Sequence, residues 1–306
     1  MELLIPAAVV GGLGLFLGVF LGVVSEKLKV DVDPREDQVR EALPGANCGG
    51  CGYPGCDALA SAIVRGEAPC NACPVGGRAV AEKISAIMGE EVKTGVRQVA
   101  YVKCAGVCGV ANRAYAYTGV MDCNIASCMP NSGDKTCTYG CLGYGSCVKA
   151  CPFDAIHIVN GIAKVDPERC KACGKCVAAC PRHLIEMVPE NAKVLVACNS
   201  RAVGMQAKKA CGAACIGCGA CEKQCPFGAI TVVDHVAHID QSLCKSCGKC
   251  IMKCPTGAIT APESILARVE KMKAQEAARL AKEKEKKAEE AKLAKEQKAL
   301  EEAAKK

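Results

Sequence analysis

The first apolar segment of the chain is Leu3–Val24, 22 residues without a charged side chain. About 20 apolar residues are enough to span a bilayer. Only Glu2 precedes the segment, whereas a cleaved signal peptide has a positive start and a shorter apolar stretch. The pattern therefore predicts a transmembrane anchor at residues 1–25. Lys27 and Lys29 follow it, which favours a cytoplasmic location for the rest of the chain.

Two amphipathic stretches follow a charged linker at residues 26–43. They read "DALASAIVRG" and "GRAVAEKISAIMG", and each ends in a glycine, Gly66 and Gly89, as helices commonly do. We expect them to be helices of a small domain at residues 44–95. Residues 96–136 show no clear period and are expected to be a cysteine-bearing connector.

Residues 137–260 contain two copies of one pattern at a constant offset. "CPFDAI" at 151 corresponds to "CPFGAI" at 225, and the cysteines of both copies coincide. We expect module 1 at residues 137–188 and module 2 at 189–261, with "TVVDHVAHID" forming a hairpin of module 2. The remainder, 262–306, has 13 basic and 10 acidic residues, which predicts a charged helical or disordered tail.

Cysteine dominates the composition. There are 27 cysteines, while aromatic residues make up 3% and Trp is absent. So many thiols serve either disulfides in an oxidising compartment or metal ligation in the cytoplasm. The expected cytoplasmic location favours metal ligation.

The cysteine spacing indicates which metal group is bound. Runs of CxxCxxC, followed by three residues and CP, occur at 170–181, 215–226 and 244–255. Three such thiolates bind three irons of one [4Fe–4S] cubane, and the cysteine before proline binds the neighbouring cluster. Zinc sites usually use two separated CxxC pairs and need neither the third cysteine nor the CP turn.

Module 2 contains two complete ligand sets. The expected ligands are Cys215, Cys218, Cys221 and Cys254 for one cluster, and Cys225, Cys244, Cys247 and Cys250 for the other.

Module 1 departs from the pattern because Tyr144 stands where the repeat predicts a cysteine. One cluster is expected to be bound by Cys151, Cys170, Cys173 and Cys176. For the other cluster, an enlarged loop is expected to supply Cys137, Cys141 and Cys147, with Cys180 as the fourth ligand.

Residues 46–56, "ANCGGCGYPGC", form a glycine-rich cysteine loop. Its glycines allow unusual backbone angles. The expected ligands are Cys48, Cys51, Cys56 and Cys73, with Cys70 as a substitute for Cys73 and a zinc knuckle as the alternative.

The connector holds four more cysteines, Cys104, Cys108, Cys123 and Cys128. Two interpretations stay open for them: a sixth cluster, or buried thiols with packing roles. Cys198 and Cys211 remain unassigned.

The formal net charge of +7 suggests nucleic-acid binding only if the clusters are ignored. Five clusters of about −2 each would bring the charge to about −3, so nucleic acid is not an expected partner. The sequence also shows no dinucleotide-binding fingerprint and no catalytic set.

The chain resembles the B subunit of the Rnf complex in the runs "LPGANCGGCGYPGC", "AIVRGEAPCNACPVGG" and "YGCLGYGSCVKACPFDAI". The resemblance covers nearly the whole chain, and the extra cysteines and doubled ferredoxin region are its departures. It implies electron transfer from reduced ferredoxin, through membrane and NAD-binding partner subunits, in an enzyme that translocates Na+ or H+. A single-pass location in the inner (cytoplasmic) membrane would follow, with the domains on the cytoplasmic side.

We therefore expect an α+β protein with a transmembrane helix, a small [4Fe–4S] domain, two ferredoxin-like modules and a charged C-terminal helix. Its function would be electron relay, without bond-making chemistry in this chain. The alternatives are a polyferredoxin of another membrane redox complex such as a hydrogenase, a redox sensor, and a zinc-stabilised scaffold.

Overall fold

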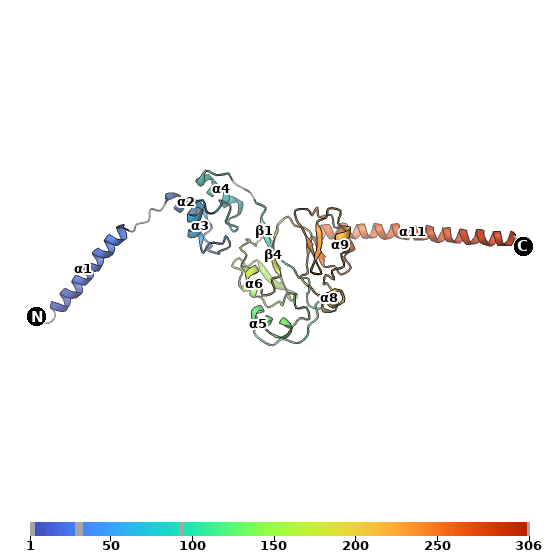
Figure 1. Cartoon of the computed structure of the whole chain (residues 1–306), viewed down its shortest axis with the longest axis horizontal. Coiled ribbons are helices and arrows are strands. Elements are labelled where there is room, and N and C mark those ends of the chain that lie inside the picture. The colour runs from blue at the N-terminus through green and yellow to red at the C-terminus, as the bar shows by residue number, and fades with distance from the viewer. Residues whose placement is uncertain (1–3, 28–32, 92–94, 305–306) are drawn as a thin grey trace. The chain divides into compact units, whose positions relative to one another are not determined.

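A computed structural model describes residues 4–27, 33–91 and 95–304, with side chains for 11–24, 33–91 and 95–286. The chain divides into two compact units, which are unit 1, Met1–Thr94, and unit 2, Gly95–Lys306 (Figure 1).

The N-terminal apolar segment forms α1, Leu4–Lys27. A bilayer span requires about 20 predominantly apolar residues. Among the residues whose placement the structure describes, no helix combines that length with that apolar character. The expected transmembrane helix at residues 1–25, and the fold class that included it, are therefore wrong on this point.

The rest of unit 1 consists of three helices, α2 (Pro34–Ala42), α3 (Cys56–Val64) and α4 (Gly77–Met88). The last two confirm the helices expected from the amphipathic stretches. Gly89 caps α4 in the left-handed region, at φ 70°, which glycine adopts without steric cost. The three helices enclose a small core that includes Val39, Leu59, Ile63 and Ile84, each almost completely buried.

Module 1 of unit 2 contains two antiparallel strand pairs. One is a hairpin of β2 (Ile156–Val159) and β3 (Ile162–Val165), and the other joins β1 (Gln98–Val102) to β4 (Ile185–Pro189). Its helices are all short: α5 (Cys123–Ser127), α6 (Ser146–Lys149), α7 (Lys175–Ala178) and the 3-10 turn η1 (Pro130–Ser132). β1 lies in the segment expected to be a connector, so this segment contributes a strand to the module.

Module 2 repeats the arrangement. Its expected hairpin is confirmed as β6 (Ile230–Val233) and β7 (Val236–Ile239), and each strand stands at the repeat offset from its counterpart in module 1. The outer pair is β5 (Leu195–Val196) with β8 (Ile259–Thr260). The helices are α8 (Gly204–Ala210), α9 (Ala220–Gln224) and α10 (Lys249–Lys253).

The cores of both modules contain cysteines among aliphatic side chains. In module 1, Cys141, Cys147, Cys170 and Cys176 are buried together with residues such as Leu184. In module 2 the buried cysteines are Cys198, Cys211, Cys221 and Cys250. Cysteine is among the residue types most often buried in proteins, and here these cysteines contribute to the packing of the module cores.

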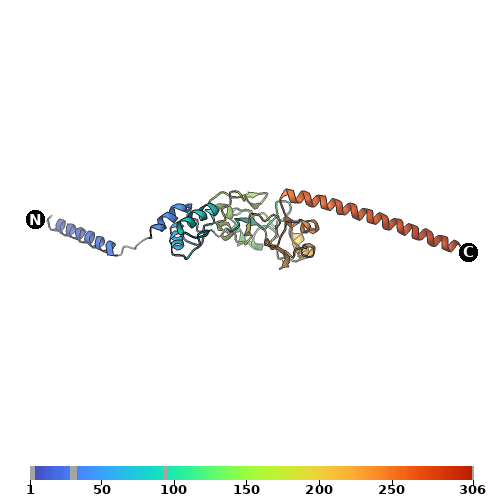
Figure 2. The same cartoon turned by 90° about the horizontal axis from the view of Figure 1, so that it is seen from above.

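The C-terminal segment is one continuous helix, α11 (Glu263–Ala304), drawn in red in Figures 1 and 2. Ile265 and Val269, one helical turn apart, are buried against module 2. Lys253 of α10 also forms an ion pair with Glu276, with Nζ 2.8 Å from Oε1. The start of the helix is thus attached to module 2, and of the two expectations for the tail the helical one is confirmed.

Candidate metal centres

Module 2 contains two cavities that are each lined by four cysteines. One is lined by Cys215, Cys218, Cys221 and Cys254. The other is lined by Cys225, Cys244, Cys247 and Cys250. In each, three cysteines come from one CxxCxxC run and the fourth precedes the proline of the other run, so the two runs exchange their last cysteines.

The local fold is the same in the three CxxCxxC runs and in the loop that carries Cys137, Cys141 and Cys147. A glycine in the left-handed region ends the loop, and a short helix begins directly after it. The third cysteine of the run is the second residue of that helix and is buried. The four glycine–cysteine pairs are Gly145 and Cys147, Gly174 and Cys176, Gly219 and Cys221, and Gly248 and Cys250.

Module 1 also contains two four-cysteine cavities. One is lined by the expected Cys151, Cys170, Cys173 and Cys176. The other is lined by Cys123, Cys141, Cys147 and Cys180. Cys137 was expected in this second set, but the structure places Cys123 there. Tyr144, the counterpart of Cys218, instead packs against Tyr117, with ring centroids 5.1 Å apart.

Cys123 reaches the cavity because α5 is fixed from two sides. The Asp122 carboxylate caps the helix by accepting the Asn124 N–H at 2.8 Å. Ser146 Oγ accepts the Cys123 N–H at 2.8 Å and donates to Asp122 at 3.0 Å. These bonds place the start of α5 beside the helix that carries Cys147. The cysteine spacing did not indicate that Cys123 lines this cavity; the signal available was Tyr144, which stands where the repeat predicts a cysteine.

Unit 1 contains a fifth four-cysteine cavity, lined by Cys48, Cys51, Cys56 and Cys73. The Asn47 side chain accepts the Cys56 N–H at 2.8 Å and so holds the loop against the start of α3. Cys70, considered as a substitute for Cys73, does not line this cavity; its Sγ lies 3.4 Å from a Glu90 carboxylate oxygen.

Backbone N–H groups point at several of these sulfurs. Gly76 donates to Cys73, Ala155 to Cys151 and Ala163 to Cys141, each at 3.4 Å. Hydrogen bonds of this kind stabilise a thiolate and tune the potential of an iron–sulfur cluster.

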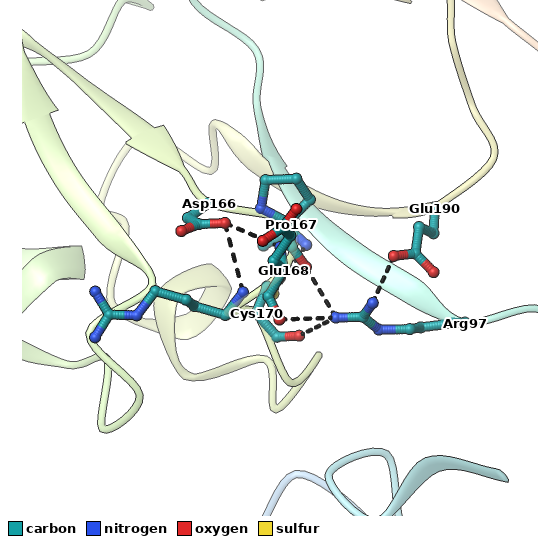
Figure 3. A network of polar contacts seen from close by, with 8 residues as sticks. Arg97, Asp166, Pro167, Glu168, Cys170 and Glu190 are labelled. Atoms are coloured by element: carbon teal, nitrogen blue, oxygen red, sulfur yellow. Dashed lines mark hydrogen bonds and ion pairs between the residues drawn. The ribbon is translucent and has the colours of Figure 1, made fainter.

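The loop of module 1 that leads to Cys170 is held by Arg97 (Figure 3). Its guanidinium donates to the carbonyls of Pro167 at 2.8 Å, Glu168 at 3.3 Å and Cys170 at 3.0 Å, and it pairs with Glu190. In β1, the Ala100 N–H donates to Cys170 Sγ at 3.4 Å. Residues of the segment expected to be a connector therefore position Cys170, which the cysteine spacing alone did not indicate.

Burial makes these thiols poor acids. It raises the pKa of Cys147 and Cys250 to about 12 and that of Cys176 and Cys221 to about 11, and neighbouring thiolates add to the effect. Such thiols become ligands when a metal centre compensates the thiolate charge.

The cavities fit a cluster of several irons. All 27 cysteines lie in described segments and are free thiols. Within those segments, no group of three or more His, Cys, Asp or Glu side chains is close enough to hold one metal ion. Instead, four thiols surround each cavity among mostly apolar groups, which suits a cubane with four cysteine ligands.

The structure does not bring the four connector cysteines around one cavity. Cys123 belongs to the set described above, while Cys108 and Cys128 are exposed. Cys104 does not line the cavity of Cys123, although its Sγ accepts the Cys141 N–H at 3.3 Å.

Comparison with known families agrees with this arrangement. A family described as "Putative Fe-S cluster" matches residues 43–75. Families described as "4Fe-4S dicluster domain" match residues 129–181, 169–229 and 214–258, and a "4Fe-4S double cluster binding domain" matches 243–300.

Three curated relatives are similar over most of the chain. The first, from Acetobacterium woodii, is the B subunit of a Na(+)-translocating ferredoxin:NAD(+) oxidoreductase complex, 49% identical over 79% of this chain and 73% of its own length. The B subunit of an ion-translocating oxidoreductase complex from Methanosarcina acetivorans is 48% identical over 78% of this chain and 90% of its own. The B subunit of the proton-translocating ferredoxin:NAD(+) oxidoreductase complex of Clostridium ljungdahlii is 42% identical over 76% and 82%.

Proposed function

This chain belongs to the family of B subunits of ion-translocating ferredoxin:NAD(+) oxidoreductase complexes, and we propose that it receives electrons from reduced ferredoxin and passes them to partner subunits. It is a multi-[4Fe–4S] electron-transfer subunit of an oxidoreductase complex. Ion translocation requires a membrane barrier, so its partners include membrane subunits of the same complex. The NAD-binding site belongs to another subunit, since this sequence has no dinucleotide fingerprint.

The observation that carries the proposal is the set of five cavities, each lined by four cysteines. We assign one [4Fe–4S] cluster to each, with the lining cysteines as ligands. For module 1 this means Cys123, and not Cys137, beside Cys141, Cys147 and Cys180. Bound clusters supply one-electron storage at a potential that the protein sets.

The residues of this chain contribute in three ways. The cysteines bind the irons, the aliphatic side chains around them exclude water, and backbone N–H groups donate to the sulfurs. All three raise or lower the reduction potential. Nothing in this arrangement makes or breaks a covalent bond of a substrate, so relay is the activity that fits.

The test is reduction by ferredoxin under anaerobic conditions. The purified full-length chain, with iron near the 20–24 per chain that about five or six cubanes require, is mixed with reduced low-potential ferredoxin. Bleaching of the cluster absorbance within seconds is expected, and dithionite serves as a reductant that needs no docking. Bleaching by dithionite but not by ferredoxin would overturn the assignment of the donor, while zinc in place of iron would overturn the relay itself.

A further inference from the structure

Four cysteines outside the five cavities lie where the two modules meet. The connector segment that pairs with module 1 provides Cys104, module 1 provides Cys137, and module 2 provides Cys198 and Cys211. The backbone brings their chain segments together. The Ala105 N–H donates to the Ala197 carbonyl at 2.9 Å, one residue beyond Cys104 and one before Cys198.

The other two cysteines are joined through Asn112. Its N–H donates to the Ala210 carbonyl at 3.0 Å, and its carbonyl accepts the Thr136 N–H at 2.8 Å. Ala210 and Thr136 directly precede Cys211 and Cys137. All four cysteines are therefore held by backbone bonds that cross between the modules or meet on one segment.

Three of the sulfurs lie close to the α-carbons of two glycines, Gly106 and Gly140. A Cβ atom on Gly106 would lie 3.5 Å from Cys104 Sγ and 3.4 Å from Cys211 Sγ. A Cβ atom on Gly140 would lie 3.4 Å from Cys137 Sγ and 3.7 Å from Cys104 Sγ. Cys104 Sγ is therefore near both Cys137 Sγ and Cys211 Sγ.

Cys104 and Cys198 occupy equivalent places relative to the strands of the two modules, although they do not stand at the repeat offset. Cys104 is two residues after the end of β1, and Cys198 is two residues after the end of β5. Each sulfur accepts the N–H of the residue two further on, Gly106 and Ser200, at 3.4 Å.

The same correspondence holds at the next contact. Cys104 Sγ accepts the Cys141 N–H at 3.3 Å, and Cys198 accepts that of Cys215, the counterpart of Cys141 in the second copy. Cys137 and Cys211 are counterparts in the same way. Two equivalent pairs of thiols thus approach each other from the two copies of the module.

Buried positive charge supports an anion at this place. Lys135 is only 2% exposed, and its Nζ donates to the carbonyls of Gly106 at 3.1 Å and Gly161 at 3.0 Å. The carboxylate of its chain neighbour Asp134 pairs instead with Arg113, at 2.7 Å. Arg182 donates to the Cys137 carbonyl at 2.9 Å, and its Nε is buried without a partner. The fully buried Asp134 carboxylate also acts on Arg182, and two buried cations so close together favour a further anion nearby.

We propose that Cys104, Cys137, Cys198 and Cys211 bind a further [4Fe–4S] cluster between the two modules. A cubane with four thiolates carries about −2, which Lys135 and Arg182 would offset. Cys137 and Cys211 each precede by four residues a ligand of a flanking cavity, Cys141 and Cys215. One electron would enter from the site in one module and leave to the site in the other, with no bond formed or broken.

The proposal rests on the proposed function for the kind of cluster, and iron content tests it separately from ferredoxin. In the full-length chain, the Cys198→Ser/Cys211→Ser variant is expected to carry about 20 irons where the unaltered chain carries about 24, as five and six cubanes require. The matched control is Cys108→Ser/Cys128→Ser, which removes two exposed thiols and should keep about 24. Iron is determined together with acid-labile sulfide and the low-temperature electron paramagnetic resonance spectrum.

Equal iron in the Cys198/Cys211 variant and the unaltered chain would overturn the proposal, as would an equal loss in the control. If the double variant does not fold, the single variant Cys198→Ser is measured instead, because serine at one position is a weaker ligand that still allows the cluster to bind. It should alter the resonance signal of one cluster and leave the others unchanged. A spectrum identical to that of the unaltered chain would also overturn the proposal.

Discussion

Replacing Cys123 by alanine tests the ligand set that the structure assigns to module 1. The variant should lose one cluster, about 4 irons per chain, and keep the others, because Cys123 lines the cavity of Cys141, Cys147 and Cys180 and none of the other four cavities described above. Cys137→Ala should keep this cluster, but it should lose about 4 irons from the cluster proposed between the modules. A full iron load in Cys123→Ala is therefore the result that only the assignment based on spacing predicts.

A second substitution should restore the cluster. Tyr144 occupies the position of Cys218 in the repeat, so the Cys123→Ala/Tyr144→Cys variant has the regular CxxCxxC run in module 1. The change removes the ring pair with Tyr117, at 5.1 Å, which contributes about 0.5–1.5 kcal/mol beyond its buried area. That cost is small compared with the metal-binding free energy of a structural site, about 10 kcal/mol or more.

The assay is iron and acid-labile sulfide per chain, followed by the visible absorption spectrum of the clusters. The expected order is a full load in the unaltered chain, about 4 irons fewer in Cys123→Ala, and a return to the full load in the double variant. Full iron in Cys123→Ala would refute the assignment. Restoration is the sharper result, since a merely structural role of Cys123 would not be rescued by a cysteine at position 144.

Three further outcomes are expected. Lys135→Met leaves the carbonyls of Gly106 and Gly161 without a donor. It should lower the free energy of unfolding by about 2–4 kcal/mol, measured as a lower denaturation midpoint. An unchanged midpoint would contradict the buried contact. In Gly143→Ala the new Cβ atom would stand on a backbone with φ +83° and would overlap the Gly161 carbonyl oxygen, whereas in Gly228→Ala it would stand on φ +62° with no atom nearby. Thermal unfolding should therefore show a larger loss of stability for Gly143→Ala than for the control Gly228→Ala, which should lose about 1 kcal/mol. Cys73→Ser should lose about 4 irons and Cys70→Ser none, and equal iron contents would argue against the cavity in unit 1.

Local patterns predicted the parts of this protein that depend on nearby residues. The hairpins β2–β3 and β6–β7, at equivalent places in the two copies, follow from alternating residues and turns within one short segment. The helices ending near Gly66 and Gly89 follow from their own periodicity and caps. The four-cysteine sets of module 2 follow because each run and its CP turn have a fixed spacing.

Contacts between distant segments could not be predicted in the same way. Cys123 joins its cavity because Ser146 and Asp122 fix α5 against α6, and no spacing rule relates these segments. The strand β1 was assigned to a connector because its partner β4 lies at the far end of module 1. The N-terminal segment shows the opposite error, since its apolar pattern predicted a span that no described helix provides.

The cysteines in the module cores also have a consequence for biosynthesis. Because the thiols assigned as ligands, such as Cys147 and Cys250, are buried among aliphatic residues of the module cores, we expect that the newly made chain does not complete its packing before iron and sulfide are inserted. Folding free energy is then partly metal-binding free energy. An unloaded chain remains accessible to proteases, so the amount of mature protein in the cell should follow the supply of iron.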